Sequence, residues 1–218
     1  MMLTLYGYKR SGNSYKAKLT CELLALDYKW VEIDIIADDN KQDDFLAINP
    51  LGQVPVLQIE KLQINTNNNT SSSDSNSTDQ STTLLESNAI IRYLANDSWL
   101  IPADPIPYAQ MWQWLLYEQN EIRANIGPIR FIKTHPDTTA HRQEEYQRKF
   151  SKAQDALSYL DKQFSNRQFI LGDNVSLADI SLYAYSHVAD KGGIDMSAYP
   201  HLKDWFKRIE SLEYYVPL

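Results

Sequence analysis

The chain has 218 residues, of which 43% are hydrophobic, and a formal net charge of −7 with a sequence pI near 5.1. This length is enough for one large or two small domains with a proper hydrophobic core. The negative charge provides no basic surface for nucleic acid and disfavours an anionic membrane surface. Because Cys21 is the single cysteine, an internal disulfide and a site of several thiolate ligands are both excluded.

Targeting and metal-binding signals are also lacking in the sequence. No apolar run approaches the roughly 18 residues of a membrane span, and the first residues lack the basic region and apolar core of a signal peptide. We therefore expect a cytoplasmic protein with no nucleic-acid or membrane partner. The histidines are scattered without the spacing of metal ligands, so no metal is expected at His135, His141, His187 or His201.

The first sixty residues predict alternating strands and helices. Leu3–Tyr6 alternates as a strand, Gly7–Asn13 forms a polar loop, and Ser14–Leu26 carries an apolar stripe at helical spacing. Trp30–Ile35 alternates as a second strand, which is parallel to the first if the helix between them is a right-handed crossover. Asp43–Ile48 is a short helical segment that stops before Asn49-Pro50.

The stretch Asn49–Leu57 places a proline at the start of a predicted strand, Val56–Ile59. An X-Pro bond adopts the cis form at a cost of only about 0.5–1 kcal/mol, so a cis Val54–Pro55 bond is expected. Such a bend exposes the amide and carbonyl of Val54 as an open edge. A short peptide can bind this edge as an added strand.

A second motif follows near the end of this region. A fourth strand is expected near Leu84–Leu85, followed by a helix over Ser87–Ala95 with Ser87 as its N-cap. Amides exposed at a helix start bind carboxylates and other anions. Between the third and fourth strands, Asn65–Thr83 contains no apolar side chain, and we expect this insertion to be a disordered loop.

The second half of the chain predicts helices only. Residues 97–107 contain three prolines and are expected to form a linker. Three stretches then have helical signals: Tyr108–Ala124, Arg142–Phe164, and His201–Ser211 after Pro200. Ser176 and Asp179 have the spacing of a capping box at the start of a further helix, with Val175 placed to pack on Ile180.

Two of these motifs together resemble the cytosolic glutathione S-transferase family: Asn-Pro-x-Gly-x-Val-Pro-x-Leu, followed by Glu-Ser-x-Ala-Ile. The resemblance implies a thioredoxin-like α/β domain over residues 1–96, with the order βαβ-α-ββα, and an all-helical domain over residues 108–218. It also implies a homodimer. Glutathione would lie along the Val54–Pro55 edge, with its γ-glutamyl end at Glu86 and Ser87 and its thiol near the first loop.

The reactive form of glutathione is its thiolate, and the pKa of the free thiol is about 8.5. The site must therefore donate hydrogen bonds to the sulfur to favour the thiolate. Ser11 is the predicted donor, because it ends the loop before the first helix. The string Arg10-Ser11-Gly12-Asn13-Ser14 resembles the theta- and zeta-like serine-type classes of the family, as found in bacterial members. Tyr6 and Ser14 are the alternatives, whereas Cys21 is expected to be a small buried residue.

Further contacts are expected around the peptide. Gln53 is placed to bind the glycyl end, Lys41 can reach the same carboxylate, and Asn13 contacts substrate or shapes the loop. Trp112, Trp114, Tyr117 and Arg123 are candidates to line an apolar pocket over the thiol, but aromatic residues at helical spacing are usually part of the core, and both alternatives stay open here.

The resemblance implies a glutathione S-transferase that activates the thiolate for attack on a small hydrophobic electrophile, a role in detoxification that needs no cofactor besides glutathione as co-substrate. Three alternatives remain open at this point: a glutathione-dependent disulfide reductase or peroxidase, an isomerase or dehalogenase of the same fold, and a noncatalytic interaction protein.

Overall fold

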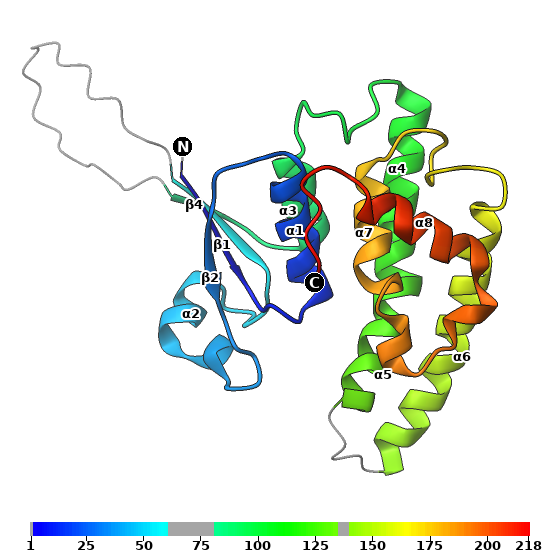
Figure 1. The fold of residues 1–218 in the computed structure, drawn as a ribbon. Helices are drawn as coiled ribbons and strands as arrows, with labels where there is room; N and C mark the ends of the chain where they lie inside the picture. The colour runs from blue at the N-terminus through cyan, green and yellow to red at the C-terminus, as the bar shows by residue number, and fades with distance from the viewer. Residues whose placement is uncertain (1, 61–80, 135–139) are drawn as a thin grey trace, which may run out of the picture.

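The computed structural model describes residues 2–60, 81–134 and 140–218, and places a small four-stranded sheet with its helices beside a group of longer helices (Figure 1). The sheet half contains four strands and three α-helices in the predicted order: β1 (Met2–Gly7), α1 (Gly12–Leu23), β2 (Lys29–Glu32), α2 (Asp43–Ile48), β3 (Val56–Glu60), β4 (Ser81–Leu84) and α3 (Ser87–Leu94).

The sheet is mixed, with the strand order β2-β1-β3-β4. β1 pairs with β2 in parallel, as the predicted crossover requires, and with β3 in the antiparallel direction. β2 is shorter than the predicted Trp30–Ile35 strand, because Asp34 starts a turn in which its carboxylate accepts a hydrogen bond from the Ile36 amide at 2.9 Å.

One predicted helix start and one predicted N-cap are wrong, by two residues and by one residue. α1 begins at Gly12 rather than Ser14, because Ser11 is the N-cap residue and its side chain accepts a hydrogen bond from the Ser14 amide. The N-cap of α3 is Glu86, not Ser87, and Glu86 has a left-handed φ of 66°.

The helical half contains one interrupted helix that the sequence did not reveal. α4 (Pro105–Tyr117) begins inside the predicted linker, since Pro105 is suited to a first helical turn. A π-helical segment, η2 (Glu118–Arg123), joins it directly to α5 (Ala124–Thr134). The remaining helices are α6 (Ala140–Gln163), α7 (Leu177–Ser186) and α8 (Pro200–Glu210), with short 3-10 turns between α7 and α8.

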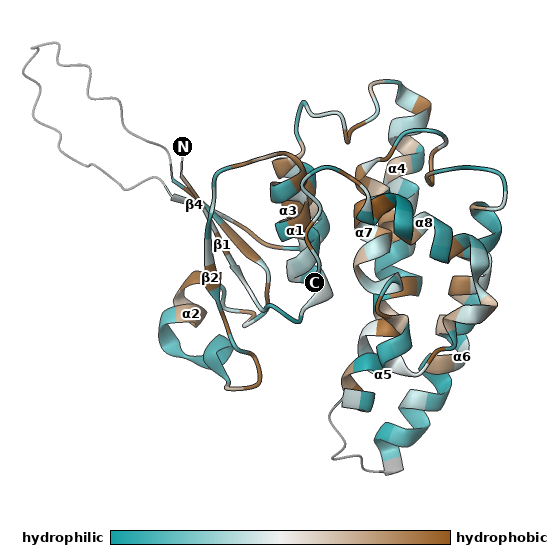
Figure 2. Cartoon of the chain, in the orientation of Figure 1, coloured by the Kyte–Doolittle hydropathy of each residue, from teal (hydrophilic) through white to brown (hydrophobic). Residues whose placement is uncertain are grey.

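α7 lies at the centre of the core. All ten of its residues are buried, and Figure 2 shows apolar residues on α7 and on the strands, while the outer helix α6 is largely hydrophilic. The predicted capping box is present: the Asp179 carboxylate accepts hydrogen bonds from the Ser176 amide at 2.9 Å and the Ile170 amide at 2.8 Å. Trp205 Nε1 on α8 donates to the same carboxylate at 3.1 Å.

The predicted insertion is only partly visible. Residues 65–80 lie outside the described residues, but residues 81–83 belong to β4 and pair with β3, so the expectation of a disordered loop is wrong there. Of the helices that the structure describes, none combines the length and the apolar character that crossing a bilayer requires.

We expect Asp179→Asn to lower the free energy of unfolding by about 3 kcal/mol, because an amide cannot accept from all of these buried donors. Urea denaturation followed by circular dichroism measures the change. Asp173→Asn is the matched control, since Asp173 lies in the preceding loop and is exposed. An equal effect of the two substitutions would contradict the prediction.

Candidate active site

A small polar cavity of about 190 Å³ lies where the 49–55 turn meets the start of α3. The Val54–Pro55 peptide bond is cis, as predicted. Six of the residues predicted to bind glutathione line this cavity: Asn13, Gln53, Val54, Pro55, Glu86 and Ser87. The two sequence motifs, separated by about thirty residues in the chain, therefore meet at one site.

Asn49 holds the turn, a role that the sequence analysis did not assign. Its side chain is almost fully buried, donates through Nδ2 to the Gln53 carbonyl at 2.8 Å, and accepts from the Leu51 amide at 3.1 Å. Gly52 has a left-handed φ of 60° within this turn. The asparagine of the Asn-Pro motif thus shapes the bend that exposes Val54.

The start of α3 closes the other side of the cavity. Glu86 lines the cavity. Its positive φ is a backbone conformation that costs a non-glycine residue about 1–3 kcal/mol. The Ser87 hydroxyl donates to Asn13 Oδ1 at 3.3 Å, and so links α3 to the start of α1. A helix start beside such a cavity is suited to a carboxylate.

Ser11 lies at the edge of a second and larger cavity, directly before α1. Its Oγ accepts one hydrogen bond, from the Ser14 amide at 3.3 Å, so the hydroxyl hydrogen is available to an acceptor in the cavity. The positive end of the α1 dipole lies beside it. This arrangement can stabilise a thiolate.

The alternative donors have other roles in the structure. Tyr6 donates its hydroxyl hydrogen to Gln58 Oε1 at 2.8 Å within the sheet, and burial raises its pKa. Ser14 is buried and its Oγ accepts from the Tyr8 amide at 3.1 Å. Neither residue lines either cavity. Cys21 is fully buried, and burial raises the pKa of its thiol to about 12, consistent with the predicted packing role.

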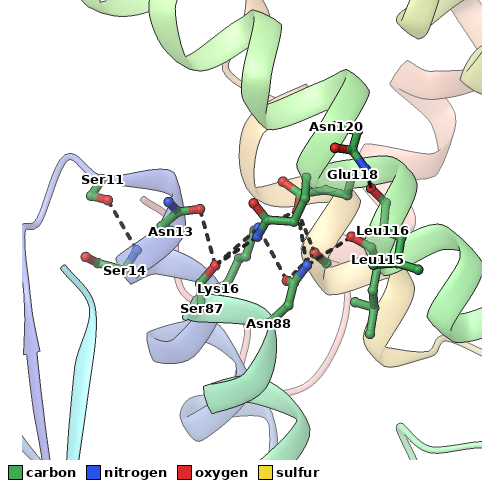
Figure 3. Close-up of polar contacts among 12 residues, drawn as sticks. Ser11, Asn13, Ser14, Lys16, Ser87, Asn88, Leu115, Leu116, Glu118 and Asn120 are labelled. Atoms are coloured by element: carbon green, nitrogen blue, oxygen red, sulfur yellow. Dashed lines mark hydrogen bonds and ion pairs between the residues drawn. The ribbon is translucent and has the colours of Figure 1, made fainter. Parts of the chain in front are cut away.

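A buried ion pair lies beneath the small cavity (Figure 3). Lys16 on α1 and Glu118 on η2 form a salt bridge with both side chains at 0% exposure. Lys16 Nζ also donates to Ser87 Oγ at 3.5 Å and Asn88 Oδ1 at 3.4 Å, and Ser181 Oγ donates to the Glu118 carboxylate at 3.1 Å. Burial lowers the pKa of Lys16.

The larger cavity has a volume of about 590 Å³ and lies between the loop after β1 and helices α5, α6 and α7. Arg123 lines it, as predicted. Trp112, Trp114 and Tyr117 do not, because they pack in the helical core, where the ring of Trp114 meets that of Tyr117 edge-on.

Tyr185 on α7 is a lining residue that the sequence analysis missed. Its ring lies so close to Gly12 that a Cβ atom at that position would lie 2.8 Å from it. Glycine is therefore required where α1 begins next to this ring.

Two other expectations concern charged side chains. Lys41 pairs with Asp38 at 2.7 Å on the surface and does not line the small cavity. Within the described part of the chain, no group of three or more histidine, cysteine, aspartate or glutamate side chains is arranged to hold a metal ion.

A thioredoxin-like sheet domain joined to a helical domain, with a polar cavity at a cis-proline turn, is the two-domain architecture of the glutathione S-transferase class. Comparisons with known proteins support this architecture. Residues 10–97 match the N-terminal domain of glutathione S-transferases, and residues 110–213 match the C-terminal domain.

Individual relatives cover nearly the whole chain. A crystal structure of a glutathione S-transferase from Pseudomonas fluorescens is 38% identical, with a TM-score of 0.86 over 100% of this chain and 98% of that chain. Disulfide-bond oxidoreductase YfcG of Escherichia coli is 27% identical over 96% of this chain and 91% of its own. The maleylacetoacetate isomerase of Mus musculus is 26% identical over 96% and 88%. The chain belongs to the glutathione S-transferase family.

We expect Glu118→Gln to destabilise the fold by about 3–5 kcal/mol, because it leaves the Lys16 ammonium buried without an opposite charge. The double variant Lys16→Met with Glu118→Gln should regain most of this loss. Urea denaturation of the two single variants and the double variant measures the coupling. Lys207→Met is the control, since it breaks an exposed pair with Asp204. Additive effects at Lys16 and Glu118 would contradict the prediction.

Glu86→Gly should separate stability from ligand binding. Glycine relieves the left-handed backbone and raises stability by up to about 1 kcal/mol, while the lost carboxylate weakens glutathione binding about tenfold. Thermal unfolding and calorimetric titration measure the two effects. Asp97→Gly is the control, because Asp97 has a φ of 56° but does not line either cavity. Unchanged binding in Glu86→Gly would exclude the carboxylate from the site.

Proposed function

We propose that this protein is an enzyme that binds glutathione in the small polar cavity and activates its thiol with Ser11. The observation that supports this most strongly is the convergence of six predicted binding residues on one cavity, with Ser11 two residues before Asn13 at the next cavity. The γ-glutamyl ammonium lies at Glu86, its carboxylate at Ser87 and the α3 amides, and the backbone of Val54 pairs with the peptide.

The chemistry follows from the position of Ser11. Its hydroxyl donates a hydrogen bond to the sulfur and lowers the pKa of the glutathione thiol below its usual value of about 8.5. The released proton goes to solvent. In a transferase reaction the thiolate forms a carbon–sulfur bond to an electrophile, and the leaving group departs with the electron pair of its bond to carbon.

Disulfide reduction is the second candidate, supported by the similarity to YfcG along most of both chains. The thiolate attacks one sulfur of a disulfide, the second sulfur leaves as a thiolate, and another glutathione resolves the mixed disulfide. Overall, two glutathione molecules become glutathione disulfide and the substrate gains two thiols. This route needs no protein cysteine, which is consistent with the buried Cys21.

A cytoplasmic homodimer is part of the proposal. Large apolar side chains are exposed near α3 and α4, including Trp99 at 56% and Ile106 at 73%, and a dimer interface would cover them. Light scattering of the purified protein decides the oligomeric state.

Ser11→Ala should lower kcat/KM for glutathione conjugation of chlorodinitrobenzene about 100-fold, because the thiolate loses a preorganised donor. The ultraviolet absorbance of the bound thiolate, followed against pH, should shift to higher pH, because the thiol pKa rises. Binding to immobilised glutathione should persist. Ser11→Thr is the matched control, since it keeps a hydroxyl and a helix cap.

Two outcomes would contradict this assignment in different ways. Full turnover in Ser11→Ala together with none in Tyr6→Phe would make Tyr6 the donor. Glutathione binding without turnover of any electrophile, disulfide or peroxide would favour a noncatalytic interaction protein.

A further inference from the structure

The larger cavity is strongly cationic in a chain of net charge −7. Its charged lining consists of five cations and one carboxylate: Arg10, Arg123, Arg130, Arg142, Lys149 and Glu145. A concave surface of one sign concentrates ligands of the opposite sign, because low-dielectric walls focus the field. The remaining lining is largely apolar and includes Ile35 and Phe131.

Three of the arginines lack an opposite charge. Among the described residues, no carboxylate lies within the 4.0 Å ion-pair distance of Arg10, Arg123 or Arg130. Arg130 is half-buried, and burial together with the nearby Arg10 guanidinium lowers its pKa. Asp190 acts on Arg130 only from beyond ion-pair distance. An arginine remains charged in such a place, so a bound anion would offset the repulsion.

A fourth cation is fixed at the wall by the backbone. Pro128 lies inside α5 and has no amide hydrogen, so the Ala124 carbonyl loses its helical partner. Lys149 Nζ on α6 donates to this carbonyl at 2.8 Å. The ammonium group is thereby held beside Pro128, which lines the same cavity.

The cations adjoin the proposed thiolate position. Arg10 immediately precedes Ser11, and both line the larger cavity. Arg123 lines both cavities, so it lies at their junction. A molecule that occupies the larger cavity therefore meets the sulfur and the arginines at the same time.

We propose that the second substrate carries a carboxylate group, which Arg130 and Arg10 bind while the apolar wall holds the rest of the molecule. This inference rests on the proposed function, and it replaces the expected hydrophobic electrophile with an anionic one. A planar guanidinium can donate two parallel hydrogen bonds to a carboxylate, which lysine cannot.

The test compares chlorodinitrobenzoate with its methyl ester, which differ in one negative charge. The ratio of kcat/KM for the acid to that for the ester should fall about tenfold in Arg130→Gln, the loss expected for one charge-assisted hydrogen bond. Intrinsic reactivity cancels when this ratio is compared between proteins. Arg10→Gln, on the exposed loop, provides a second variant if Arg130→Gln does not fold.

Arg148→Gln is the matched control, because Arg148 is exposed on α6 and does not line the cavity. It makes the same change in net charge and should leave the ratio unchanged. An unchanged ratio in both Arg130→Gln and Arg10→Gln, or an equal fall in Arg148→Gln, would overturn the inference.

A binding measurement without glutathione tests this inference independently of the test of the proposed function. Fluorescence titration of the wild type should show tighter binding of chlorodinitrobenzoate than of its ester, even if neither is turned over. Equal affinities would overturn the inference, whatever the enzyme activity. In the same titration, a loss of affinity in Arg130→Gln for glutathione disulfide but not for chlorodinitrobenzoate would assign the carboxylate to a second peptide rather than to a small acid.

Discussion

The buried ion pair between Lys16 and Glu118 is the constraint on which the site depends. Lys16 comes from the first helix of the sheet domain, and Glu118 comes from the π-helical segment of the helical domain. Two charges removed from water are stable only with good geometry and further hydrogen bonds, which Ser87, Asn88 and Ser181 supply. The pair therefore fixes how the two halves meet, and Ser87 receives its position from the same contacts.

The π-helical segment that carries Glu118 also carries a residue of the two cavities. Glu118 lies in the core, whereas Arg123, at the other end of the segment, lines both cavities. π-helical turns inserted in α-helices are rare and are frequent at functional sites. A single irregular turn thus supplies both the anchor beneath the small cavity and a cation at the junction of the two.

The two cavities differ in the residues that line them, and so in the ligands that they suit. The smaller is polar, built from a bent turn and a helix start, and is suited to the ends of a peptide. The larger gathers arginines, three of which, Arg10, Arg123 and Arg130, have no carboxylate within ion-pair distance among the described residues, although the chain as a whole is acidic. Ser11 lines the larger cavity, two residues before Asn13 in the smaller one, so under the proposed function a thiolate at Ser11 would meet a donor hydroxyl and an anion-attracting cavity together.

The sequence by itself determined the features that depend on neighbouring residues. The cis-proline turn and the capping box at Ser176 were predicted because each is encoded within a few positions. The parallel first crossover was predicted from the order of the elements, and the binding residues around the small cavity from the resemblance to the family. Only the tertiary structure decided the rest. Glu118 meets Lys16 across 102 positions, and Tyr185 and Arg130 reach the larger cavity from separate helices. For Trp112, Trp114 and Tyr117 the sequence left a pocket role and a core role open, and the structure places them in the core. Helical spacing defines a buried face but not which cavity or neighbour that face will meet.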